Sequence, residues 1–112
     1  MPIQHKNLAA GRWFDLSLME QLANTGSEVE RTIKWKEKGN PSYSDQAFVR
    51  ALELLDLILN DPKNRKRLKE ITRVRELLVD YFCFDNRYQS SDEKWRSYFL
   101  SFNYAVRKEK LN

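Results

Sequence analysis

The sequence is poor in the residues that make tight turns, with three glycines and three prolines among 112 residues. A β-sandwich or a small barrel needs a turn after nearly every strand, and so few turn residues do not supply them. Four long helices need only three turns. The composition therefore favours an all-α fold.

Cysteine and long apolar runs are also scarce. The single cysteine, Cys83, cannot form an internal disulfide, and no run of about 18 apolar residues is present that could span a membrane. Residues 1–12 lack the apolar centre of a signal peptide. We therefore expect a cytoplasmic protein that does not contact a membrane.

The shortage of histidine and cysteine bears on catalysis. Zinc sites and di-iron bundles need several Cys or His ligands, whereas His5 is the sole histidine. Cys83 lies between Phe82 and Phe84, which favours a buried small side chain over a nucleophile paired with His5. The glycines are too far apart for a phosphate-binding loop. We expect no catalytic residue, no metal and no cofactor.

What the sequence does contain is a repeated helical pattern, in which 41% hydrophobic and 32% charged residues alternate at helical spacing. Short connections between consecutive helices predict an up-down-up-down four-helix bundle. Two helical hairpins exchanged between copies would use the same helices and stay an alternative. In chain order, the expected segments are a loose N-terminal arm at 1–14 and a single domain at 15–112 with helices at 16–38, 42–60, 62–84 and 90–110.

Capping residues and turn formers set the expected helix ends. Gly39-Asn40 ends the first helix, and Pro62 begins the third. Only Gly26 lies inside a helix, in the middle of its apolar face, where it costs about 1 kcal/mol relative to Ala. We expect two helices to approach closely at Gly26, with a ligand slot as the alternative. The expected N-caps are Asp15, Ser42 or Ser44, Asp61 and Ser90, the last in an S-x-x-E capping box with Glu93.

The start of the third helix is strongly basic, although the whole chain has a net charge of only +4. Cations at a helix N-terminus oppose the helix dipole, so they predict a compensating anion. A bound phosphate or nucleic acid is one source. Neighbouring carboxylates, including Glu70 four residues after Lys66, are the favoured one. The basic residues are Lys63, Arg65, Lys66, Arg67, Lys69 and Arg73.

Arg75 falls inside the apolar stripe of the same helix, so we expect a buried polar contact with Glu53 or Asp56, or with Glu30. Carboxylates at helical spacing, Glu53 with Asp56 and Glu76 with Asp80, would also suit a Mg²⁺-dependent enzyme. The nearby arginines favour salt bridges instead.

Several apolar side chains lie outside the apolar stripes of their helices. Clusters of this kind indicate a surface that binds a partner, and we expect a homodimer. The candidate interface residues are Trp35, Val49, Leu57, Leu100 and Tyr104.

Three segments, LANTGSEVERTIKWKEKGN (22–40), ALELLDLILNDP (51–62) and RLKEITRVRELLVDYF (67–82), cover under half of the chain. They resemble small uncharacterised prokaryotic all-helical proteins and, more loosely, the HEPN-like bundles found beside nucleotidyltransferase subunits. Ribonucleases of that group carry an Arg followed a few residues later by His on a late helix. No His follows His5 here, so the resemblance implies a non-catalytic member that acts as a helical binding or assembly partner.

These observations favour a non-catalytic interaction protein that self-associates. A nucleic-acid-binding or phosphate-binding module that uses the basic start of the third helix is the alternative.

Overall fold

The computed structural model describes residues 11–111, in which every regular element is helical. The expected all-α class is therefore confirmed. In chain order the elements are α1 (Trp13–Asp15), α2 (Leu18–Glu37), α3 (Pro41–Leu59), the 3₁₀ helix η2 (Pro62–Arg67), α4 (Leu68–Cys83) and α5 (Asp92–Leu111).

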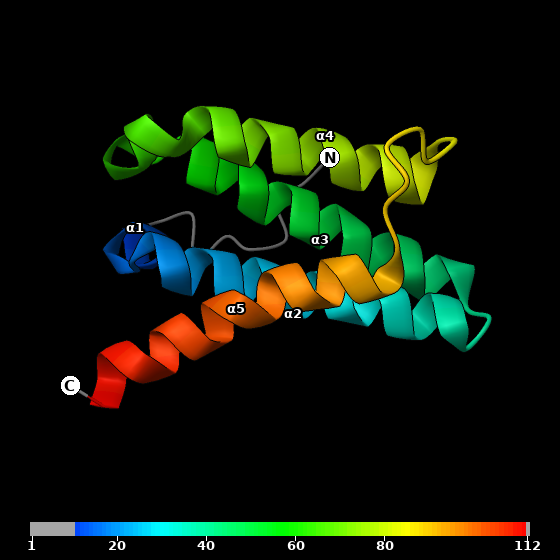
Figure 1. The fold of residues 1–112 in the computed structure, drawn as a ribbon, viewed down its shortest axis with the longest axis horizontal. Coiled ribbons are helices and arrows are strands. Elements are labelled where there is room, and N and C mark those ends of the chain that lie inside the picture. Colours follow the sequence, from blue (N-terminus) through cyan, green and yellow to red (C-terminus); the bar gives the residue numbers. More distant parts are fainter. Residues whose placement is uncertain (1–10, 112) are drawn as a thin grey trace.

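Helix α2 is central, since it packs against α3 on one side and α5 on the other. Figure 1 shows that α4 lies outside α3, that the four long helices alternate in direction, and that α5 crosses α2 obliquely. Side chains link α4 to the start of α5, where the Tyr81 hydroxyl donates a hydrogen bond of 2.6 Å to Asp92. The helices thus form a layered arrangement with α2 inside it.

The first two long helices begin at caps that differ from those expected. Ser17, not Asp15, caps α2: its hydroxyl accepts a hydrogen bond from the Glu20 N–H, and the Glu20 carboxylate accepts one from the Ser17 N–H. At α3 the Asn40 side chain accepts a hydrogen bond from the Tyr43 N–H, so the cap precedes Pro41.

The later boundaries agree more closely with the sequence. Asp61 accepts a hydrogen bond from the Lys63 N–H, as expected, but Pro62–Arg67 is a 3₁₀ helix and α4 begins only at Leu68. Ser91, one residue after the expected Ser90, accepts a hydrogen bond from the Lys94 N–H at the start of α5.

The core combines apolar residues from every long helix. Trp13 of α1 is completely buried in it, which corrects the expected extent of the loose arm; residues 1–10, including His5, lie outside the described part of the chain. The largest fully buried apolar side chains are Trp13, Leu22, Ile33, Leu54, Leu55, Ile58, Ile71 and Leu78.

Helix α2 also buries polar residues, because neighbours cover it on two sides. The hydroxyls of Thr25 and Thr32 each donate a 2.9 Å hydrogen bond to the backbone carbonyl one turn earlier. The buried Glu28 carboxylate accepts from Arg31 at 2.6 Å and from Arg50 of α3 at 3.2 Å. An ion pair therefore joins α2 to α3 within a largely apolar contact.

A second buried polar group ties the start of α2 to η2. Gln21 donates hydrogen bonds to Asp61 (2.9 Å) and to the Trp13 carbonyl (3.1 Å), and it accepts one from Asn64 (2.9 Å). Burial alone would raise the pKa of Asp61, but hydrogen bonds from Lys63 and Gln21 outweigh it and hold that pKa below its usual value.

Candidate interaction surface on helices α2 and α5

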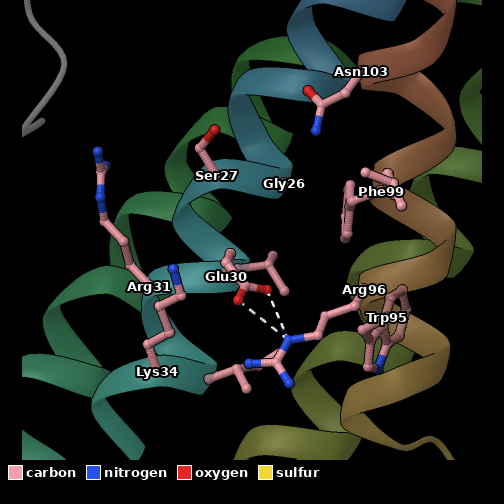
Figure 2. Close-up of a pocket in the computed structure, with 12 residues that line it drawn as sticks. Gly26, Ser27, Glu30, Arg31, Lys34, Trp95, Arg96, Phe99 and Asn103 are labelled. Carbon is pink, nitrogen blue, oxygen red and sulfur yellow. Dashed lines mark hydrogen bonds and ion pairs between the residues drawn. The ribbon is translucent and has the colours of Figure 1, made fainter.

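A groove with a volume of about 470 Å³ runs between α2 and α5 (Figure 2). Its floor is largely apolar, and polar side chains stand along its rims. The lining residues are Gly26, Ser27, Val29, Glu30, Arg31, Ile33, Lys34, Trp95, Arg96, Phe99, Leu100 and Asn103.

Gly26 sets how closely the two helices approach along this groove. A Cβ atom at position 26 would lie 2.7 Å from the Phe99 Cβ, closer than van der Waals contact allows. Figure 2 shows Phe99 facing Gly26 across the groove. The expected close approach of helices at Gly26 is therefore confirmed.

The groove contains one cross-helix cluster of charges. Arg96 of α5 donates to Glu30 of α2 at 2.9 and 3.2 Å, and its guanidinium lies 3.1 Å from Glu37 (Figure 2 draws the Glu30 bonds). Hydrogen bonding to Glu30 and the charges of both carboxylates raise the pKa of Arg96. The positive charge of Arg96 is thus balanced by two carboxylates of α2, and these ion pairs join α5 to α2.

The outer face of α5 carries a row of exposed residues that we call the α5 stripe: Glu93, Ser97, Leu100, Tyr104 and Arg107. Successive members are four or three residues apart, so they lie on one face of the helix. Leu100 is 53% exposed and Tyr104 is 66% exposed. Leu100 also lines the groove, so the stripe and the groove form one continuous surface.

The other expected interface residues are more covered than the sequence suggested. Trp35 is half-buried, with its ring 4.8 Å from that of Tyr43 in an edge-to-face contact. Val49 is half-buried, and Leu57 packs against the core. Val49 and Leu57 lie on α3, which has neighbours on two sides, and Trp35 lies on α2 against Tyr43. Leu100 and Tyr104 are therefore the exposed members of the set.

Half of the basic cluster is paired with carboxylates. Lys63 pairs with Asp61 and donates to the Phe14 carbonyl at 3.1 Å. Arg67 pairs with Glu70 at 2.7 Å. Arg73 lies 3.6 Å from Glu76, and its guanidinium stacks over the Tyr88 ring, 4.5 Å from the centroid.

The other half of the cluster, Arg65, Lys66 and Lys69, is exposed and makes no hydrogen bond or ion pair with another residue of the described chain. The expected pair of Lys66 with Glu70 does not form, because Glu70 pairs with Arg67 one turn away. Three cations in η2 and the first turn of α4 therefore remain available to a partner.

The expected buried polar site is at the surface. Arg75 pairs with Asp56 at 2.8 Å, but their side chains are 35% and 52% exposed, and Glu53 is half-buried. The buried Asp80 accepts hydrogen bonds from the backbone N–H groups of Arg87 and Tyr88, and so holds the loop before α5. These residues link elements of the fold.

Two further observations concern chemistry. Cys83, expected to be buried, is exposed near the end of α4. Partial burial of its sulfur and the charge of Asp45 raise the pKa of the thiol, so it is protonated at neutral pH. Among residues 11–111, no three His, Cys, Asp or Glu side chains are grouped so as to hold a metal ion.

Comparison with known protein families, with curated proteins and with solved structures finds no match for this chain. The resemblance to HEPN-like bundles gains no support from these comparisons. Across residues 11–111, no helix has both the length and the apolar character needed to cross a bilayer.

Proposed function

We propose that this chain is a non-catalytic helical interaction protein that forms a homodimer through the α5 stripe and the adjoining groove. The observation that carries the proposal is the exposure of Leu100 and Tyr104 beside an open, apolar-floored groove. In this proposal the four long helices make up the up-down-up-down bundle, and α5 presents its outer face to the partner.

The physical basis is the apolar area that α5 leaves in contact with water. Burying such area contributes roughly 25 cal/mol per Å², and tyrosine is among the residues that dominate protein interfaces. A two-fold dimer buries Leu100 and Tyr104 of both copies, so each apolar contact is made twice.

The test is the mass in solution by light scattering at high micromolar concentration. We expect twice the chain mass of 13.4 kDa. Replacing Leu100 and Tyr104 together by Ser should return the protein to the monomer mass. Phe84→Ser, which alters an exposed aromatic residue directly after α4, should leave the dimer intact. A wild-type mass near 13.4 kDa would overturn the proposal.

A second candidate function is binding of nucleic acid or phosphate at η2 and the first turn of α4. It rests on the unpaired, exposed cations Arg65, Lys66 and Lys69. Phosphate contacts of this kind weaken steeply as salt is added. We expect single-stranded RNA to bind at about 50 mM salt and the double variant Lys66→Glu/Lys69→Glu to lose that binding. If neither RNA nor DNA binds the wild type under these conditions, this candidate is rejected.

A further inference from the structure

We infer that the two copies pair through their α5 helices in antiparallel order, so that Leu100 of each copy faces Tyr104 of the other. This inference rests on the proposed self-association and specifies its geometry.

The first argument is the period of the α5 stripe. Its members follow one another at alternating separations of four and three residues, from Glu93 to Arg107. This mean spacing of 3.5 residues is the one that keeps a row of side chains facing a neighbouring helix over several turns. All five members are exposed, and no helix of the described chain covers them. The stripe is therefore suited to a helix supplied by a second molecule.

The second argument is the distribution of charge along α5. The first turn has two acidic residues, Asp92 and Glu93, and one basic residue, Lys94, so its net charge is negative. The last turn has two basic residues, Lys108 and Lys110, and one acidic residue, Glu109, so its net charge is positive. An antiparallel partner places each acidic start beside a basic end, where a parallel partner would place like charges together. Antiparallel order also opposes the two helix dipoles favourably.

The third argument is that such a contact is complete with two copies. A two-fold axis midway between Leu100 and Tyr104 brings each Leu100 opposite the second copy's Tyr104. In this register each Glu93 lies about one helical turn, roughly 6 Å along the axis, from the second copy's Arg107, a distance that the two long side chains can bridge. This contact uses the same patch on both copies, so it ends at two molecules and does not propagate. Because Leu100 lines the groove, the opposing tyrosine ring lies at the groove mouth beside Phe99.

The experiment exchanges the charges at the two ends of the stripe. Glu93→Arg places a second arginine within about one helical turn of the second copy's Arg107, and Arg107→Glu places a second glutamate within about one turn of the second copy's Glu93. Each variant alone should dimerise roughly tenfold more weakly than the wild type, since two attractive pairs become repulsive. An equimolar mixture of the two variants should restore dimers, because the mixed pair has opposite charges at both ends.

The matched control is Glu109→Arg, which makes the same charge change on α5 at an exposed position away from the stripe, and it should not affect dimerisation. Circular dichroism establishes that each variant is folded. If the single variants weaken association and the mixture does not recover it, the antiparallel pairing is wrong. If the wild type is a dimer and both variants dimerise as tightly as it does, the antiparallel pairing is also wrong. The proposed self-association then still stands. A monomeric wild type overturns both.

Discussion

Gly26 and Phe99 share a contact that leaves no room for a side chain at position 26, since an added Cβ would lie 2.7 Å from the Phe99 Cβ and 3.0 Å from its Cγ. Both atoms sit close to the backbone of α5, so the helices themselves would have to separate.

Gly26→Ala should therefore destabilise the protein although Ala is the better helix former. Overpacking costs about 1–3 kcal/mol, which exceeds the gain of about 1 kcal/mol in helix propensity. Gly26→Leu should prevent α5 from docking. Denaturant unfolding measures both changes, with Ser27→Ala, at the exposed neighbouring position, expected to be nearly neutral. A more stable Gly26→Ala variant would show that the contact is not tight in solution.

Glu28→Gln should lower the free energy of unfolding by about 1–2 kcal/mol. The substitution removes the buried negative charge that pairs with Arg31 and Arg50. Glu76→Gln provides the comparison, since its pair with Arg73 is exposed and should contribute less than about 0.5 kcal/mol. The two variants are compared by their urea midpoints at constant slope. Equal small effects would mean that the α2–α3 ion pair is screened by solvent.

The depressed pKa of Asp61 predicts a loss of stability in acid. A carboxyl whose pKa is lower in the folded state stabilises the fold above its ordinary value of 3.8, and that contribution disappears as the pH falls through the folded pKa. Melting temperatures of the wild type should therefore decline below about pH 4, and Asp61→Asn should reduce this decline. Asp45→Asn, at an exposed site, should keep the wild-type profile.

The hydrogen bond from Tyr81 to Asp92 predicts a loss of stability at high pH. Burial and this hydrogen bond raise the pKa of Tyr81 to about 12. A raised pKa gives stability that is present below pH 10 and is lost as the pH rises toward 12. Tyr81→Phe should lower the free energy of unfolding by about 1 kcal/mol at neutral pH. The difference in stability between this variant and the wild type should become smaller as the pH rises from 10 toward 12. A constant difference would argue against the bond in solution.

The sequence was most informative where local chemistry decides the outcome. Asp61 followed by Pro62 marks a chain reversal by itself, and the apolar stripe of α3 that includes Leu54 and Leu55 identifies its buried face. It was less informative about α2, because Thr25, Glu28 and Thr32 are polar and yet buried. Their hydrogen-bond partners come from α2 itself and from α3, and an amphipathic pattern does not reveal such satisfied polar groups.

Only part of the candidate interaction surface was predictable from the sequence, and the reason is similar. Leu100 and Tyr104 are exposed as expected, whereas Trp35 is covered by Tyr43 across the turn that joins α2 to α3. Whether an apolar residue off the main stripe is exposed depends on which neighbour lies beside it. That choice of neighbours is a property of the whole fold, and helical periodicity does not specify it.

The central position of α2 has a consequence for the order of folding. Its contact with α3 joins helices that follow one another in the chain, whereas the bond from Arg96 to Glu30 closes a separation of 66 residues. Local contacts form before distant ones because they lose less chain entropy. Helix α5 should therefore dock last and be released first, with its amide protons exchanging ahead of those in α2 and α3. A released α5 leaves the Gly26 surface open to the α5 of another molecule, which is the event that an exchange of helices between two copies requires.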